Sequence, residues 1–586
     1  MKLLRVCMKH RSVGFVDIPE KYRLLGGRAL TSSIICDEVD PKCHPLGPNN
    51  KLVFAPGLVT GTVAPSSGRL SVGGKSPLTG TIKESNAGGI PAQMLARLGI
   101  KAIIVEDQPD DDEMYILKID ASGAELLPAG DLAGKGMYEF NSLVRDRYGK
   151  GTGIIAIGPA GEMKLLNAGI SCNDMENGPG RYAGRGGLGA VMGSKGLKAI
   201  IVIEDEKRRV PIANKELFDK GRKKLTDALT SHDVTSNALT NYGTAVLINI
   251  MNEAGGLPTR NFSAGRFEGA AKISGEAINE TTGKRGGVGK TGHPCHPGCV
   301  IRCSNVWAKP DGSYHVAPIE YESDWALGAN CGIDDLDVIA ELNYICNDTG
   351  LDTIEAGCTL AVAMEAGLAE FGDGQKAIEL LREVGKGTPL GRILGNGTEF
   401  TAKAFGVTRC PTVKGQSMPA YEPRAVKGIG VTYATTTMGA DHTAGYTIAP
   451  EILKVGGDVD PATTEKAELA RAFQATTVFI DTAGYCLFIA FAILDIPEGF
   501  EGMVETVNGV LGTNWTTDDV TRLGLEWLKR EREFNEAAGF TKADDRLPEF
   551  MRYEELPPHN TVWDVPDEIL DAVHDYEVED KAERAG

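Results

Sequence analysis

The chain has 586 residues, more than one hydrophobic core usually serves, so we expect several domains with room to enclose a large cofactor. A formal net charge of −19 disfavours nucleic acid and anionic membrane surfaces as partners. The N-terminal residues lack the apolar core of a secretory signal, and no apolar run reaches the roughly 18 residues of a membrane span, which predicts a soluble cytoplasmic protein.

The first third of the chain has the pattern of a sheet. Up to about Ile203, short β-rich runs alternate with Gly/Pro turns, most clearly at residues 51–54, 101–105, 114–117 and 199–203. No internal repeat is visible in the sequence. The charged stretch 204–209 is the clearest composition break and indicates a domain boundary.

Helical periodicity dominates from Asn214 onward, and several predicted helices open with Asp or Thr caps. The predicted helices cover residues 215–231, 244–254, 334–347, 353–371, 375–384, 463–480, 502–511 and 517–538. The acidic tail after Asp564 is expected at the surface. The predicted fold class is therefore α+β, with a β-rich N-terminal domain followed by mainly helical domains.

Three cysteines occur close together in a loop that contains Pro and Gly. Cys295, Cys299 and Cys303 are each separated by three residues, so one loop could wrap a metal centre. Disulfides are disfavoured in a large, unsecreted chain. An iron–sulfur cube needs four ligands, and Cys486 is the best candidate for the fourth.

Two other interpretations of this loop remain open. The thiols could simply be buried, or Cys295 and Cys299 could hold a structural zinc together with His293 and His296. The cysteines at positions 7, 36, 43, 172, 331, 346, 358 and 410 are expected in the core.

Two glycine-rich loops could approach a phosphate closely. Residues 184–189 match G-x-G-x-x-G, but that fingerprint requires a strand before it and a helix after it. The sequence predicts no clear ten-residue helix here, which disfavours a nicotinamide-binding unit. Arg181, Arg185 and many amide N–H groups would still suit an anionic cofactor. The second loop covers residues 64–80 and 86–89, for which plain hairpin turns are the alternative.

These segments together resemble the aldehyde:ferredoxin oxidoreductase family, from the N-terminus to about Leu547. The resemblance is carried by residues 69–80, 181–195, 320–330, 350–353 and 481–487. It implies a tungsten or molybdenum bis-pyranopterin on a β-rich saddle domain, residues 1–208, with two helical domains, residues 209–412 and 413–586. The second domain would carry the cysteine loop and the third the fourth cluster cysteine.

The resemblance also implies the residues around the cofactors. A 4Fe-4S cluster would be held by Cys295, Cys299, Cys303 and Cys486, with Arg69 between pterin and cluster. Backbone carbonyls of Asn86 and Ala183 would hold a magnesium ion, which prefers oxygen ligands. The implied pterin-binding residues are Arg69, Lys75, Asn86, Ala87, Gly88, Arg181, Tyr182, Ala183, Gly184, Arg185, Asn347, Gly350, Leu351, Asp352, Asp481, Gly484, Tyr485 and Leu487.

The chain departs from the family pattern at several positions. The D-x-x-G-L-[CD] signatures appear as residues 347–352 and 481–486, with Asn347 in place of a carboxylate and Tyr485 in place of leucine. The first two cluster cysteines are one residue further apart than is common. Tyr344 stands where members with a bridging metal have histidine, so no such metal is expected, while a homodimer or a hetero-oligomer remains open.

The implied reaction is the oxidation of an aldehyde to a carboxylic acid with water. Glu322 would act as general base and His442 would donate a hydrogen bond to the aldehyde oxygen. Electrons would pass through the cluster to ferredoxin or an iron–sulfur partner subunit. The alternatives are an aromatic-ring coenzyme A thioester as substrate, or a non-catalytic iron–sulfur or zinc-binding subunit. Glu322 and His442 together favour an aldehyde, although which aldehyde is not readable from the sequence.

Overall fold

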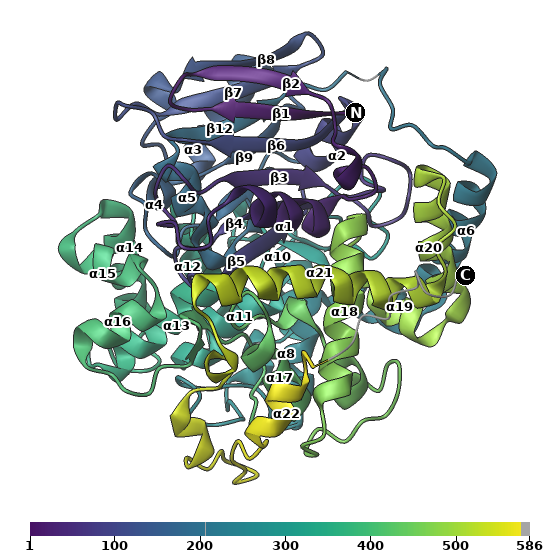
Figure 1. Cartoon of the computed structure of the whole chain (residues 1–586). Coiled ribbons are helices and arrows are strands. Elements are labelled where there is room, and N and C mark those ends of the chain that lie inside the picture. Colours follow the sequence, from purple (N-terminus) through teal and green to yellow (C-terminus); the bar gives the residue numbers. More distant parts are fainter. Residues whose placement is uncertain (206, 576–586) are drawn as a thin grey trace.

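The structure is a computed structural model that describes residues 1–205 and 207–575. Figure 1 shows the N-terminal strands gathered at one end of the molecule, with the helices of the later chain packed beneath them. This arrangement confirms the predicted α+β order. Within the described ranges, none of the helices combines the length and the apolarity needed to cross a bilayer.

The N-terminal domain contains two six-stranded sheets, ordered β2-β1-β6-β3-β4-β5 and β11-β10-β9-β12-β7-β8. All four predicted strand regions belong to them, as β3, β6, β7 and β12. The strands are β1 (Lys2–Cys7), β2 (Ser12–Val16), β3 (Leu52–Pro56), β4 (Leu70–Lys75), β5 (Ile82–Ala87), β6 (Ile100–Glu106), β7 (Tyr115–Asp120), β8 (Gly123–Pro128), β9 (Gly153–Ala156), β10 (Ile170–Cys172), β11 (Arg181–Ala183) and β12 (Leu197–Val202).

The two sheets repeat one topology. In each, the first strand pairs antiparallel with the second and parallel with the sixth, and the third to fifth strands follow as antiparallel neighbours. The helices repeat as well. Helices α1 (Gly27–Glu38) and α3 (Met137–Tyr148) follow the second strands, while α2 (Pro91–Arg97) and α5 (Leu188–Ser194) precede the sixth. The sequence hides this repeat because a buried strand needs apolar residues of suitable size rather than particular ones.

Strand alternation explains how the sheets pack. Ile103 and Val105 of β6 share one apolar cluster with Ile200 and Val202 of β12, so the sheets lie face to face. The intervening residues of each strand point outward, where those of β6 pack with α1 and those of β12 pack with α3. The domain therefore has four layers, helix, sheet, sheet and helix.

The helical part matches the predicted pattern most closely at two long helices. Helices α6 (Lys215–Ser231) and α21 (Thr517–Ala538) have the predicted bounds. The region 244–254 is a 3-10 turn, η5 (Thr244–Val246), followed by α8 (Leu247–Glu253). The predicted helix 353–371 was too long. It ends at Glu365 because Gly367 turns the backbone with a φ of +81°.

Helix α20 packs on α6 and α18 packs on α21, and in Figure 1 α21 runs along the edge of the strands near β5. The other helices are α4 (Pro159–Glu162), α7 (Leu239–Tyr242), α9 (Ala270–Ile273), α10 (Gly275–Arg285), α11 (Tyr321–Leu327), α12 (Leu336–Thr349), α13 (Thr353–Glu365), α14 (Gly374–Lys386), α15 (Pro389–Gly395), α16 (Thr398–Phe405), α17 (Lys427–Thr435), α18 (Ala467–Ala483), α19 (Ile489–Asp495), α20 (Pro497–Leu511) and α22 (Asp567–Ala572). Short strands β13 (Lys290–His293), β14 (Ser304–Ala308), β15 (Tyr314–Val316), β16 (Thr412–Val413) and β17 (Gln416–Ser417) complete the fold.

The acidic tail is less exposed than its charge suggested. Val565, Leu570 and Val573 are buried, because α22 packs on α17 and α18. The expectation of a surface position therefore holds for Asp567, Glu568 and Asp575, which are exposed, but not for the apolar residues between them; residues 576–586 lie outside the described part of the chain.

Candidate active site

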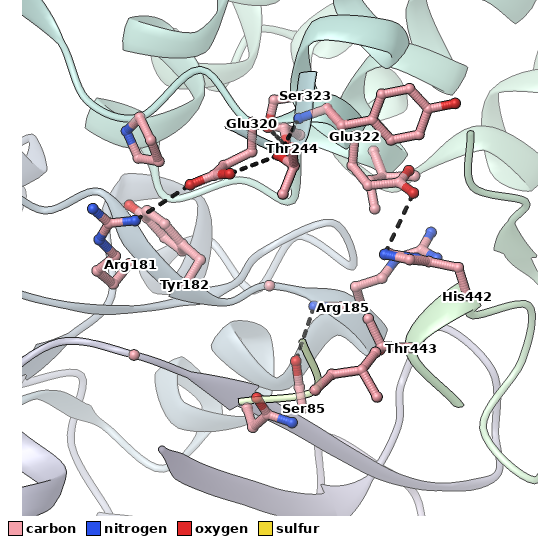
Figure 2. A pocket seen from close by; sticks show the side chains of 18 of the residues that line it. Ser85, Arg181, Tyr182, Arg185, Thr244, Glu320, Glu322, Ser323, His442 and Thr443 are labelled. Atoms are coloured by element: carbon pink, nitrogen blue, oxygen red, sulfur yellow. Dashed lines mark hydrogen bonds and ion pairs between the residues drawn. The ribbon is translucent and has the colours of Figure 1, made fainter. Parts of the chain in front are cut away.

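A cavity of about 340 Å³ lies where the two sheets meet the helical part. Strands β5 and β11 are adjacent edge strands, and both contribute side chains to the cavity wall, including Glu84 and Arg181. Helix α11 and the loop around His442 also line it (Figure 2), and this loop packs on β5, where the Glu84 N–H donates to Met438 Sδ at 3.2 Å. Segments from every part of the chain therefore build one site.

Two helix ends bring the family-like signatures to this cavity in the same way. Helices α12 and α18 both end at a left-handed glycine, Gly350 with φ +86° and Gly484 with φ +88°. In each, the glycine N–H and the next N–H donate to one carbonyl in the last turn, at 2.9 Å for α12 and at 3.0 and 3.1 Å for α18. This C-terminal turn requires glycine because of its positive φ.

Each of these turns packs closely against the loop after the third strand of one sheet. A Cβ on Gly350 would come within 2.8 Å of the Gly158 nitrogen, and one on Gly484 within 2.7 Å of the Gly57 Cα. The close contact positions the last helical turns over the cavity. Asn347 and Asp481, the first residues of the two signatures, both line it.

The cysteine loop lies at one end of the cavity. The ligand atoms of Cys295, His296 and Cys299 lie within 4.8 Å of one another, and Cys295, Cys303 and Cys486 line the cavity. Ser66 ties the two cysteine segments together, since its N–H donates to the Gly298 carbonyl at 2.9 Å and its carbonyl accepts from the Cys486 N–H at 2.8 Å. A hydrogen bond with Cys295 lowers the pKa of the Cys299 thiol to about 7.

The zinc interpretation fits this geometry less well. His293 Nε2 lies 2.8 Å from a carboxylate oxygen of Glu176, and His293 is not part of the group of ligand atoms within 4.8 Å of one another that Cys295, His296 and Cys299 form, so the predicted Cys2His2 set is not assembled. The Nε2 atom of buried His296 has no hydrogen-bond partner and remains available as a ligand. A four-thiol set from two segments matches an iron–sulfur cube better than a Cys2His2 set.

Buried arginines supply positive charge along the floor. Arg69 Nη2 donates to Cys486 Sγ at 3.3 Å, while its Nε is buried without a partner. Burial opposes its charge, but the thiols of Cys486 and Cys295 more than offset this, so the pKa of Arg69 is raised. Arg181 and Arg185 lie on the cavity wall, and Arg181 also has an unpartnered Nε. Free donors on buried cations are what an anionic cofactor would satisfy.

Glu322 and His442 face each other inside the cavity (Figure 2). His442 Nε2 lies 3.4 Å from Glu322 Oε1, while Glu322 Oε2 accepts from the Ala420 N–H at 3.0 Å. Burial raises the pKa of Glu322 to about 8 and lowers the pKa of His442 to about 4. At neutral pH the site therefore holds a mostly protonated carboxyl beside a neutral imidazole, and a small change in environment would move the proton.

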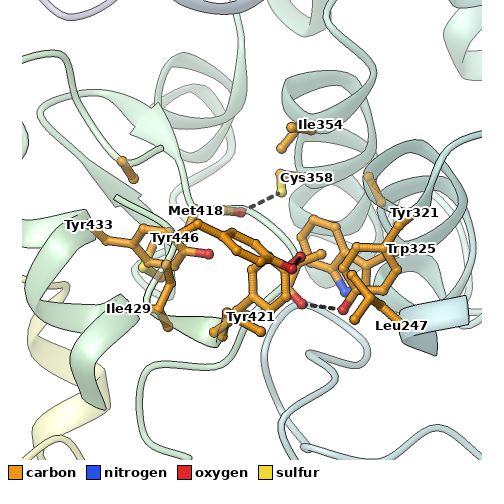
Figure 3. Packing of buried hydrophobic residues seen from close by; sticks show 14 of the residues in the cluster. Leu247, Tyr321, Trp325, Ile354, Cys358, Met418, Tyr421, Ile429, Tyr433 and Tyr446 are labelled. Carbon is orange, nitrogen blue, oxygen red and sulfur yellow. Dashed lines mark hydrogen bonds between the residues drawn. The ribbon is translucent and has the colours of Figure 1, made fainter. Parts of the chain in front are cut away.

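Aromatic side chains close the site on the helical side. The hydroxyls of Tyr421 and Tyr446 are 2.7 Å apart, and Tyr321 donates to the Ala420 carbonyl at 2.8 Å. Figure 3 shows these rings packed together in the core beside Met418 and Ile429. They exclude water from the side of the cavity where Glu322 and His442 lie, which explains the shifted pKa values.

Most of the residues implied by the resemblance line this cavity. Besides Glu322 and His442, they are Arg69, Asn86, Gly88, Arg181, Tyr182, Gly184, Arg185, Asn347, Leu351, Asp352, Asp481 and Leu487. Ala87, Ala183, Gly350, Gly484, Tyr485 and Lys75 are not part of the lining. The Lys75 ammonium donates to the carbonyls of Pro41 and Cys43, so its positive charge is directed away from the cavity.

Several charged residues of the site were not predicted from the sequence. Glu84 lines the cavity with a buried oxygen that has no partner, and burial raises its pKa. Asp441 also lines it, 3.5 Å from the Lys83 ammonium. Asp441 precedes His442 and could have been inferred from that motif. Glu84 and Lys83 lie on β5, and only the pairing of the sheets brings them here.

The prediction for the elements that flank the glycine fingerprint, residues 184–189, needs a correction. Strand β11 precedes it, and the helix α5 of seven residues follows after the turn η3 (Arg185–Gly187). The strand–turn–helix order is thus present, although the helix is shorter than ten residues, as expected. Arg185 occupies the turn, and its guanidinium bonds to Asp352 at 3.1 Å and to the Ser417 carbonyl at 2.8 Å.

Comparison with known proteins identifies the family. The family model for the N-terminal domain of aldehyde ferredoxin oxidoreductase matches residues 3–204, and the model for its domains 2 and 3 matches residues 220–576. The chain belongs to the aldehyde ferredoxin oxidoreductase family. It is similar to the tungsten-containing aldehyde ferredoxin oxidoreductase of Pyrococcus horikoshii, 38% identical over 579 residues, which covers 95% of this chain and 92% of that protein.

More distant relatives share the fold with other activities in their names. An aliphatic sulfonate oxidoreductase, WOR-like subunit, from Pyrococcus furiosus is 26% identical over 608 residues, covering 95% of this chain and 90% of that one. The solved active-site complex BamBC of benzoyl coenzyme A reductase, with 1,5-dienoyl-CoA, superposes with a TM-score of 0.80 at 19% identity, covering 98% and 94% of the chains. Family membership alone therefore does not specify the substrate.

Proposed function

We propose that this protein oxidises aldehydes to carboxylic acids with water, using a tungsten or molybdenum bis-pyranopterin and a 4Fe-4S cluster. The observation that carries the proposal is the Glu322 and His442 pair, 3.4 Å apart in the same cavity that the cysteine loop reaches. An acid–base pair, buried cations and a thiol set in one enclosure are the parts that such a reaction requires.

The two side chains have complementary roles. Converting an aldehyde and water to a carboxylic acid releases two electrons and two protons, so a proton acceptor is needed. Ionised Glu322 takes a proton from the attacking water at Oε1, its unpartnered oxygen. Neutral His442 donates one N–H to the aldehyde oxygen and stabilises the charge that develops there. The tyrosine wall excludes bulk water and strengthens both interactions.

The proposed cofactor residues are supported by the charges and thiols of the site. The bound group-six metal would accept the two electrons of the reaction. Arg69, Arg181 and Arg185 have the charge to hold pterin phosphates. Cys295, Cys303 and Cys486 from the cavity lining, with Cys299 beside Cys295, would hold the cube. Arg69 donates to Cys486 from within the cavity wall, so its guanidinium would lie between the two groups.

Several finer assignments belong to this proposal. A magnesium ion on the carbonyls of Asn86 and Ala183 would link the pterin phosphates, although Ala183 is not in the cavity lining. The electron acceptor would be ferredoxin or an iron–sulfur partner subunit. The division of the helical part at residues 412 and 413, the cytoplasmic location and the oligomeric state also remain predictions.

The deciding experiment is anaerobic purification followed by elemental mass spectrometry. One tungsten or molybdenum with about four irons per chain is expected, together with aldehyde-dependent reduction of an added ferredoxin or viologen dye. Zinc as the sole metal would overturn both the cofactor and the function. An aromatic-ring coenzyme A thioester is the rival substrate, so reduced dye with benzoyl coenzyme A belongs in the same assay.

A further inference from the structure

Glu84 is a buried carboxyl in the wall of the active-site cavity, and the reaction proposed above does not use it. It lies on β5 and is only 6% exposed. Its Oε1 atom has no hydrogen-bond partner within residues 1–205 and 207–575. A buried acceptor without a donor is unfavourable, so this position favours a ligand that supplies the donor.

The strand directs Glu84 toward the same part of the cavity as Asn86. Residues two apart on a strand share a face, and both of these line the cavity. Asn86 Nδ2 donates to Asp481 Oδ1 at 3.2 Å, so the end of α18 lies next to β5 at this point. Burial, and after it the charge of Glu84, raises the pKa of Asp481, which places the two carboxyls close together.

The cations near these two carboxyls are already engaged. Arg28 Nε and Nη2 bond to the two carboxylate oxygens of Glu531 at 3.0 and 2.9 Å, and Arg28 Nη1 lies 3.5 Å from Asp481 Oδ2. The Lys83 ammonium lies 3.5 Å from an oxygen of Asp441. Both cations therefore have carboxylate partners other than the carboxyl on β5.

Glu84 and Asp481 differ in the acceptor capacity that remains. Asp481 has Asn86 at Oδ1 and Arg28 at Oδ2, whereas Glu84 Oε1 has no donor in the described chain. Carboxylates bind forked pairs of N–H donors, as they do in their pairs with arginine. A pterin ring carries such a fork, because its amino group stands beside a ring N–H. Glu84 therefore suits the ring of the cofactor rather than its phosphate.

We propose that Glu84 is a further cofactor-binding residue, which accepts hydrogen bonds from the ring N–H groups of one pterin. The inference rests on the pterin cofactor of the proposed function and adds a residue that the family resemblance does not imply. The end of α12 differs from that of α18, because the residue at the position of Asp481 is Asn347, an uncharged amide whose Nδ2 lies 3.4 Å from Tyr138 Oη. One pterin should therefore depend on Glu84 more than the other.

The first test measures how firmly the cofactor is held, which requires no substrate. Pterin released from the anaerobically purified holoenzyme on mild heating is measured by its fluorescence after oxidation. Glu84→Gln keeps one acceptor oxygen and should release pterin about tenfold faster, since a hydrogen bond to a charged group contributes about that factor to affinity. Glu84→Leu should release it faster still. Iron per chain should not change in either variant, because thiols hold the cluster, and release at the wild-type rate in both would overturn the proposal.

Glu451→Gln is the matched control. Glu451 is also buried, and its Oε2 atom has no partner in the described part of the chain, but it is not part of the cavity lining. This variant should release pterin at the wild-type rate. If it accelerated release as much as Glu84→Gln does, the effect would come from removing any buried carboxyl, and the proposal would be refuted.

Pterin retention also separates this inference from the proposed reaction. If the wild type holds pterin but oxidises no aldehyde, while Glu84→Gln releases pterin faster, the proposed function fails and the role of Glu84 stands. If aldehydes are oxidised and pterin release does not depend on Glu84, the function stands and the role of Glu84 is refuted. A wild type that contains no pterin would refute both.

Discussion

Replacing Glu322 by glutamine should lower activity and raise stability. The carboxylate acts as the base, but burial makes its ionised form unfavourable in the folded protein. Gln keeps the shape and can still accept from the Ala420 N–H, but it cannot take a proton. General base catalysis typically contributes 10² to 10⁴ in rate, so we expect kcat to fall by about that factor.

The pH dependence follows from the shifted pKa. With a pKa of about 8, Glu322 is ionised in roughly one molecule in ten at pH 7. If the carboxylate is the base, kcat/KM of the wild type should rise with pH up to about 8 and then level off. The Glu322→Gln enzyme should lose that rise, because its residual activity no longer depends on this proton.

The stability effect has the opposite sign. In the unfolded chain Glu322 titrates near its ordinary pKa of 4.5, whereas burial raises the folded value to about 8. The contribution of protonated Glu322 to the free energy of unfolding is thus fully present below pH 4.5 and is lost as pH rises through 8. At pH 7 the loss is about 3 kcal/mol, from 1.36 kcal/mol for each of roughly 2.5 pH units. The Glu322→Gln variant avoids this loss and should unfold at a higher temperature than the wild type.

The assay combines steady-state kinetics with thermal unfolding at pH 5 and pH 7.5. We expect the melting-temperature advantage of Glu322→Gln to be larger at pH 7.5 than at pH 5. Glu320→Gln is a control, since Glu320 also lines the cavity but is paired with Arg181 and Thr244. An advantage that does not change with pH, or an unchanged pH–rate profile in the variant, would refute the reasoning.

Three further predictions concern neighbouring residues. His442→Phe should reduce kcat by about 10² to 10³, as loss of one charge-stabilising donor does, and His442→Gln should recover part of the lost kcat. Because its pKa of about 4 keeps His442 neutral, neither variant should alter the pH profile of kcat/KM above pH 6. Cys486→Ser should lower iron per chain and bleach the visible absorbance, whereas Cys358→Ser, a buried thiol outside the cavity, should leave both unchanged; equal iron loss would contradict the proposed ligand set. Arg69→Met should make the cluster potential more negative in a redox titration, because a buried cation beside Cys486 stabilises the reduced form; a positive shift would contradict this.

Local patterns predicted much of this protein correctly. The alternation of short apolar runs predicted the sheets, and the helical period predicted α6 and α21 at their observed bounds, since both signals depend on near neighbours in the chain. The cysteine spacing likewise named Cys295 and Cys303, and the family resemblance named Glu322 and His442, all of which line one cavity. Chemistry that depends on a short motif can therefore be predicted from the sequence alone.

What the sequence could not determine depends on contacts between distant segments. The doubled topology of the two sheets, the placement of Glu84 in the cavity wall and the direction of Lys75 away from it all arise from pairing and packing. The cavity itself is the clearest case. Its lining comes from edge strands of both sheets, from α11 and from the segments around His442 and Cys486, so no local pattern contains it and only the packing of distant segments leaves this space between them.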